Sequence, residues 1–134
     1  MHVPRFAVTL FVSAALLFAL QPMVARMIVP LLGGAPAVWI VCSLCFQALL
    51  LAGYGYAHVL GSRLPVRVQV IVHLVVVASA FLVMPIAVDE AAARTLSTGN
   101  PSLGLIALLL RTVGLPFFVL ATTSPLLQRW FAEL

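Results

Sequence analysis

Charged residues are unusually rare in this sequence. It contains no lysine, three acidic residues and seven arginines, so only 7% of its 134 residues are charged, whereas 64% are hydrophobic. Soluble domains carry about 25% charged residues, which they need to cover their surface in water. The deficit excludes a soluble globular domain, and lipid is the solvent that we expect around most of the chain.

Other absences exclude particular kinds of function. The arginines are scattered singly, so the net charge of +4 does not indicate binding to nucleic acid. No glycine-rich loop follows a strand pattern, and Ser124 lacks a nucleophile-elbow sequence. Cys42 and Cys45 have neither a second ligand pair for zinc nor a following histidine for haem. We therefore expect no enzyme site and no cofactor, and we interpret the two cysteines as packing residues.

Four long apolar runs make up most of the sequence, at 6–24, 37–60, 68–88 and 102–123. About 20 apolar residues are enough for a helix to cross a hydrocarbon core of ~30 Å. In lipid every backbone group must be satisfied within the segment, so even the β-branched third run is expected to be helical. A signal peptide is the alternative for the first run, but that run is long and no good cleavage site follows it.

The predicted fold is thus an all-α integral membrane bundle of four transmembrane helices, forming one domain over residues 1–134. We expect the first helix to falter near Gln21 and Pro22, because proline lacks an amide donor. Gly114 and Pro116 should kink the fourth helix, which Asn100 or Ser102 should cap at its start. Residues 126–134 are expected to form an interfacial tail anchored by Trp130.

The arginines outside the apolar runs also predict an orientation. Most of them fall on the side shared by the N-terminus, the second connector and the C-terminus, and arginine accumulates in cytoplasmic loops. We therefore expect both termini in the cytoplasm, for a protein of the bacterial inner membrane. The residues on this side are Arg5, Arg63, Arg67 and Arg129, and those on the other side are Arg26 and Arg94.

Small residues repeat every four positions along the second run. Such a stripe lets another helix approach closely, and close packing is a main source of attraction between helices in lipid. We expect the stripe to be the principal helix-packing face. Its members are Ala48, Ala52, Gly53, Ala57 and Gly61.

Arg111 is the one charge inside an apolar run. A charge there costs about 2.5–3.5 kcal/mol on the translocon scale, and no acidic residue lies within any run. Three interpretations remain open: snorkelling or hydrogen bonding within the chain, for example to Gln21 or Gln47; docking to another chain; and binding of an anionic substrate. The lack of a buried carboxylate also argues against a self-sufficient proton or cation carrier.

Four stretches of the sequence resemble a known family. They are residues 21–39, which run from Gln21-Pro22 through Arg26 and Gly33-Gly34 to Trp39; residues 46–58; residues 113–118, with Gly114 and Pro116; and residues 124–131, with Gln128 and Trp130. Together they resemble the N-terminal membrane region of bacterial spermidine synthase-like membrane proteins, which are described as major-facilitator/spermidine synthase fusions.

The resemblance implies a membrane module. In that family more helices follow, and usually a soluble domain similar to aminopropyl transferases. The sequence carries none of that domain's motifs, so no catalytic residue can be carried over and the resemblance implies no transferase activity here.

Three functions remain open at this point. The first is a non-catalytic membrane module that serves as a scaffold or as one piece of a larger assembly. The second is a small transporter subunit that works as an oligomer. The third is an accessory subunit of an electron-transfer or light-harvesting complex, which would contact its partner through Gly53, Ala57 and Gly61 or through the apolar face of the third run.

Overall fold

The computed structural model describes residues 3–32, 36–88, 91 and 100–133 of the chain. In these ranges the chain is almost entirely helical, which confirms the predicted all-α membrane bundle. The elements are α1 (Val3–Leu32), α2 (Pro36–Arg63), α3 (Val66–Phe81), α5 (Pro101–Leu109), the short π-helix η1 (Leu110–Gly114) and α6 (Leu115–Ala132).

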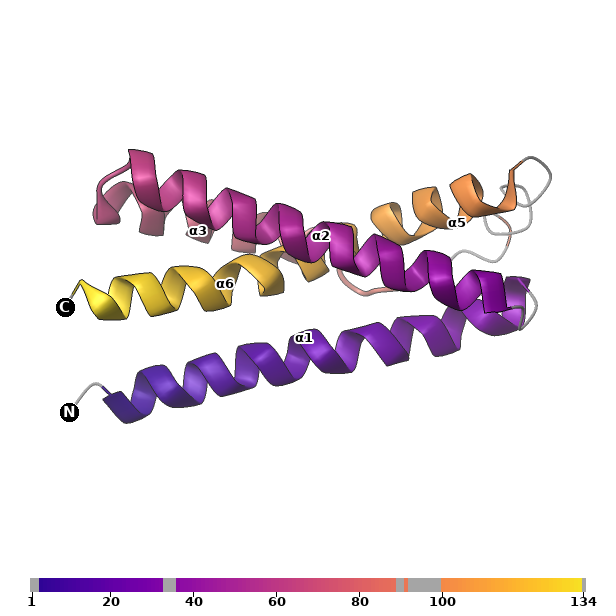
Figure 1. Cartoon of the computed structure of the whole chain (residues 1–134), viewed down its shortest axis with the longest axis horizontal. Helices are drawn as coiled ribbons and strands as arrows, with labels where there is room; N and C mark the ends of the chain where they lie inside the picture. The colour runs from indigo at the N-terminus through magenta and orange to yellow at the C-terminus, as the bar shows by residue number, and fades with distance from the viewer. Residues whose placement is uncertain (1–2, 33–35, 89–90, 92–99, 134) are drawn as a thin grey trace.

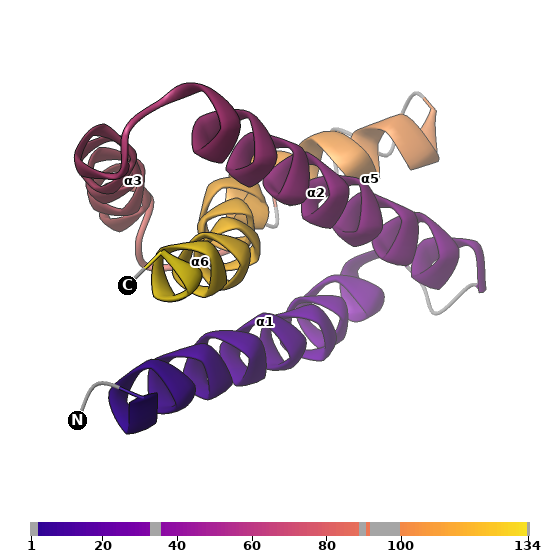
Figure 2. The ribbon, with the colours of Figure 1, turned by 60° about the vertical axis from the view of Figure 1, so that its left-hand side comes forward.

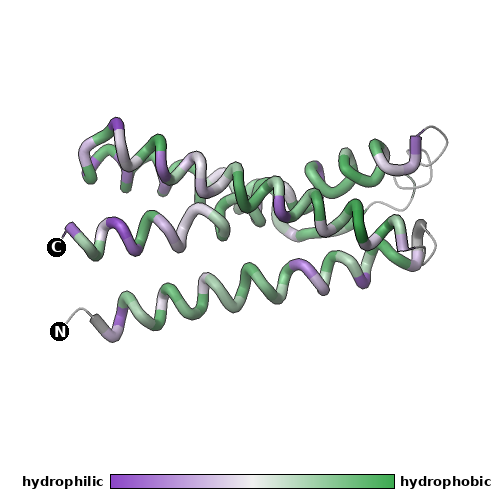
Figure 3. Tube along the Cα trace, viewed as in Figure 1, coloured by the Kyte–Doolittle hydropathy of each residue, from purple (hydrophilic) through white to green (hydrophobic). Residues whose placement is uncertain are grey.

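Three helical stretches are long and apolar enough to cross a membrane, over Pro4–Pro30, Pro36–Arg63 and Pro101–Ala132. Many of their large apolar side chains are exposed, as expected where lipid replaces water as the solvent. Apolar residues extend along all the helices, and polar ones gather mainly toward their ends (Figure 3). The molecule is a membrane protein.

The helix in the third apolar run is shorter than predicted. Its helix ends at Phe81 rather than near residue 88, which leaves 16 residues, or about 24 Å of helix. Pro85 explains the early end, because proline lacks an amide donor and disfavours helical backbone in the residue before it. Residues 82–88 continue without regular structure, and Ile86 and Val88 pack against the main core.

The first helix does not falter at Pro22 as predicted. α1 continues through Pro22 and Pro30 to Leu32. A proline removes one hydrogen bond from the ladder, and membrane helices tolerate this loss because an extended, unpaired backbone in lipid would cost more. The following connector, with Gly33 and Gly34, lies outside the described residues.

The fourth run forms one continuous helical stretch, which extends beyond residue 123 and includes residues 126–132 of the predicted interfacial tail. α6 continues through Pro125 to Ala132. The predicted irregularity near Gly114 and Pro116 is present as the π-helix η1, and α5 and α6 run in different directions on either side of it (Figure 2). Asn100 caps α5, its Oδ1 accepting from the amides of Ser102 at 3.1 Å and Leu103 at 3.4 Å, as predicted.

α6 is the central element of the bundle. It contacts α1, α2 and α3, which surround it (Figure 2). Both ends of the chain lie at the same end of the molecule as the α2–α3 connection (Figure 1). The main core lies between α1, α2 and α5–α6 and includes Cys42 and Cys45, both unpaired and buried as the packing interpretation requires.

Candidate functional site

The predicted packing stripe divides into two parts. Gly53, Ala57 and Gly61 are buried, whereas Ala48 and Ala52 are exposed and do not belong to the face that packs within the chain. The two sets differ because residues 52 and 53 are about 100° apart around a helix. Only one of these two sets of small residues can face α6.

Gly53 and Gly61 lie directly against α6. A Cβ atom added at Gly53 would lie 2.8 Å from the Ala121 Cβ, and one added at Gly61 would lie 2.6 Å from an Nη atom of Arg129. The glycines therefore serve a contact inside this chain. Gly53, Ala57 and Gly61 are therefore covered by α6 and are not free to receive a partner in this structure.

A polar cluster that sequence reasoning missed joins α3 to α6. Gln69 is 1% exposed and uses both ends of its amide: its Nε2 donates to the Leu64 carbonyl at 2.7 Å, and its Oε1 accepts from the Trp130 Nε1 at 2.9 Å. His73, one turn further, is also buried; its ring lies 6.0 Å from that of Trp130 in an edge-on arrangement. Gln69 and His73 are four residues apart in an apolar run, a spacing that places them on one helix face and could have revealed the cluster.

The hydrogen bonds of Thr123 assign the tautomer of His73. The Thr123 hydroxyl donates its one proton to the Val119 carbonyl at 2.7 Å, so at 3.2 Å from the His73 Nε2 it acts as an acceptor. Neutral His73 then carries its proton on Nε2. Its Nδ1 is buried and has no hydrogen-bond partner in the described part of the chain.

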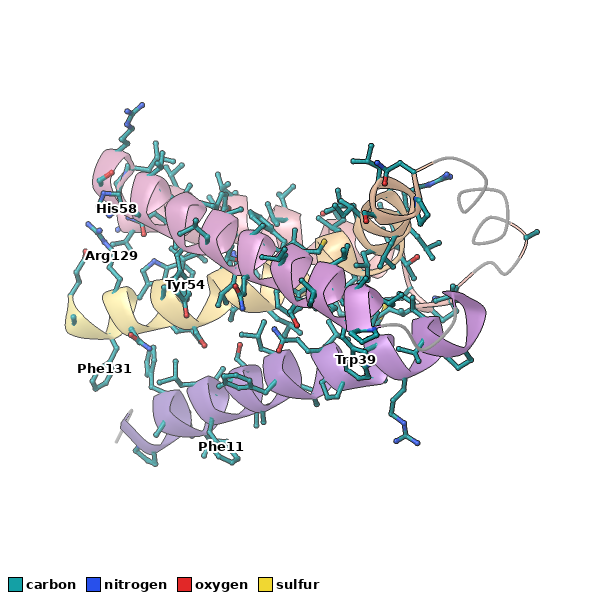
Figure 4. The ribbon with its side chains drawn as sticks, turned by 45° about the vertical axis from the view of Figure 1, so that its right-hand side comes forward. Phe11, Trp39, Tyr54, His58, Arg129 and Phe131 are labelled. Carbon is teal, nitrogen blue, oxygen red and sulfur yellow. The ribbon has the colours of Figure 1, made fainter. Side chains whose placement is uncertain are left out.

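A second group of polar side chains lines a groove between α1 and α2. The groove encloses about 270 Å³ and is bordered by Gln21, Ser43 and Gln47, with Trp39 at one side. Figure 4 shows Trp39 at the start of α2, beside α1. None of the three polar side chains makes a hydrogen bond within the described residues. The groove thus offers amide and hydroxyl groups at a depth where lipid cannot pair with them.

Arg111 does not enter this groove in its own chain. It lies in η1 and is exposed, and its guanidinium makes no hydrogen bond or ion pair with any described residue. It follows the start of its helical stretch at Pro101 by ten residues, or about 15 Å. The predicted hydrogen bond from Arg111 to Gln21 or Gln47 of the same chain is therefore absent from the described residues.

The residues that carry the family resemblance fall in several places. Pro22 lines the groove with Gln21 and Trp39, and Arg26 is exposed on α1. Gly114 and Pro116 are buried where η1 meets α6. Gln128 borders a small apolar groove between α1 and α6, and Trp130 belongs to the α3–α6 cluster. No family model, curated protein or solved structure matches this chain.

Proposed function

We propose that this protein is a non-catalytic membrane module that forms one piece of a larger assembly in the membrane, related to the membrane region of spermidine synthase-like proteins. The observation that carries the proposal is Arg111. A guanidinium that is exposed about 15 Å into an apolar helical stretch, with no partner among the described residues, costs about 2.5–3.5 kcal/mol in lipid. A neighbouring chain that supplies acceptors removes that cost.

Residues 82–88 support the same proposal. They are not helical, and Leu82 and Met84 are 87% and 54% exposed. Irregular backbone is tolerated at membrane depth only where protein or a water-filled cavity covers it. A partner lying against the end of α3 would provide this cover.

The resemblance to spermidine synthase-like proteins supports the kind of module rather than an activity. Three residues of the resembling stretches, Gln21, Pro22 and Trp39, meet in one groove although they belong to two helices. These three residues of the resembling sequence therefore contribute to one surface. No residue of the chain is proposed to be catalytic.

Extraction from the native membrane tests the assembly. We expect the protein to resist alkaline washing of membranes and to migrate in native-membrane discs as a complex well above the 14.3 kDa of one chain. Native mass spectrometry of the discs gives the stoichiometry. A population consisting of single chains alone would contradict the proposal.

The proposed orientation, with both termini in the cytoplasm of a bacterial inner membrane, has a test of its own. Ser62 and Ser102 are exposed at opposite ends of the bundle, and a cysteine at either position should leave packing unchanged. In intact cells a membrane-impermeant maleimide should label Ser102→Cys and spare Ser62→Cys until the membrane is opened, because the arginine-rich end faces the cytoplasm. The reverse pattern would overturn the orientation. The unsubstituted protein, whose two cysteines are buried, is the control for background labelling.

A further inference from the structure

The free guanidinium of Arg111 and the free polar groups of the α1–α2 groove lie at the same depth in the bundle. α1 ends, and α2 and α5 begin, at one end of the molecule (Figure 1). Gln21 precedes the end of α1 at Leu32 by eleven residues, and Gln47 follows the start of α2 at Pro36 by eleven. At 1.5 Å per residue both lie about 16 Å from this end, and Arg111 lies about 15 Å from it.

We propose that Arg111 of one copy inserts into the Gln21–Ser43–Gln47 groove of a second copy of this chain. The inference rests on the proposed function, since it names the chain itself as a partner in the assembly. Copies inserted in the same orientation present matching surfaces at matching depths. Arg111 of one copy and the groove of its neighbour then lie at similar distances from the same end of the two molecules.

The chemistry of the two surfaces is complementary. A guanidinium has five N–H donors and no acceptor, and it stays charged in proteins. The groove supplies the carbonyl oxygens of Gln21 and Gln47 and the hydroxyl of Ser43, none of which is paired within the described residues. Trp39 adds an aromatic face at the edge of the groove, to which a guanidinium is attracted.

A second copy is favoured over a lipid phosphate as the partner. A phosphate that reached Arg111 would leave the acceptor oxygens of the groove unpaired in lipid, whereas the contact between copies pairs these oxygens with the donors of the guanidinium in one step. The contact joins two different surfaces, so it either closes reciprocally in a dimer or repeats around a ring whose axis is perpendicular to the membrane.

Two variants that fail alone and succeed together test this contact. Arg111→Leu keeps the groove and loses the guanidinium, and the double variant Gln21→Leu, Gln47→Leu keeps the guanidinium and loses the groove. Tagged and untagged full-length copies are co-expressed, extracted into native-membrane discs and pulled down through the tag. Capture of the untagged copy should fall at least about tenfold for each variant paired with itself, as when charge-assisted hydrogen bonds are removed.

Pairing the two variants with each other should restore capture, because one intact guanidinium then meets one intact groove. Gln128→Leu, which removes an exposed amide from another surface, should capture its copy like the unsubstituted chain. A merely structural role of Arg111 would not give this complementation. Self-capture by Arg111→Leu at the unsubstituted level, or failure of the mixed pair, would overturn the contact.

The outcomes also separate this inference from the proposed function. If the unsubstituted chain captures a different membrane protein in a fixed ratio and no second copy, the result contradicts the contact between copies and supports the larger assembly. If it captures neither a second copy nor another protein, the result contradicts both the contact between copies and the proposed assembly.

Discussion

Replacing Gly53 by leucine is expected to separate α2 from α6 and to lower the free energy of unfolding by about 1–3 kcal/mol, the usual cost of overpacking a tight interface. A Cβ atom alone would come within 2.8 Å of the Ala121 Cβ and 3.3 Å of its carbonyl carbon. The second of these atoms is backbone and cannot turn away. The helices must therefore move apart, and the contacts around Ala57 and Leu126 would loosen with them.

Gly55 provides the matched control. It lies on the same helix two residues later, and a Cβ added there would meet nothing within 4 Å. Gly55→Leu should therefore not lower the free energy of unfolding, because nothing is overpacked and glycine inside a helix costs about 0.5–1 kcal/mol relative to alanine. Both variants can be compared by unfolding in mixed micelles, followed through the fluorescence of Trp39 and Trp130. Equal stability of the two variants would contradict the α2–α6 packing.

Replacing Gln69 by leucine is expected to be the second large perturbation, with a loss of about 1–3 kcal/mol. The substitution leaves the Trp130 indole N–H and the Leu64 carbonyl without their partner. Measured interhelical hydrogen bonds in membranes average about 0.6 kcal/mol, but Gln69 is 1% exposed and holds two groups at once. The loss should therefore fall above that average.

A double-mutant cycle separates the hydrogen bond from simple packing. Trp130→Phe removes the indole donor while keeping an aromatic ring, and the combined Gln69→Leu, Trp130→Phe variant should lose less than the sum of the two single variants. Gln128→Leu, at an exposed amide on the same helix as Trp130, serves as the control and should be close to neutral. Strict additivity in the cycle would show that the two side chains do not interact.

The sequence predicted the fold class well because the membrane imposes it. Apolar runs of about 20 residues with charges between them have few alternatives to transmembrane helices. The same local information found the cap at Asn100 and the irregularity near Gly114 and Pro116, since both depend on residues within one turn. The predicted break in the first helix at Pro22 was wrong, because α1 continues through this proline.

Which small residues face a neighbour was only partly predictable. Spacing identified Gly53, Ala57 and Gly61 together with Ala48 and Ala52, but a row of small residues does not reveal on which side the next helix lies. The polar cluster of Gln69 and His73 was missed for a related reason. Its partners Thr123 and Trp130 are about 50 to 60 residues away in the sequence, and only folding brings them into contact.

The low charge content of the chain, by itself, determined that it lies in a membrane and crosses it as helices, because desolvating backbone and charge in lipid is too costly for any other arrangement. Tertiary structure decided the rest. Packing around α6 covered Gly53, Ala57 and Gly61, buried Gln69 and His73, and left Arg111 and the polar residues of the α1–α2 groove without partners among the described residues. Those positions depend on how helices rotate against one another, and helix rotation is set by contacts between distant segments rather than by any local run of residues.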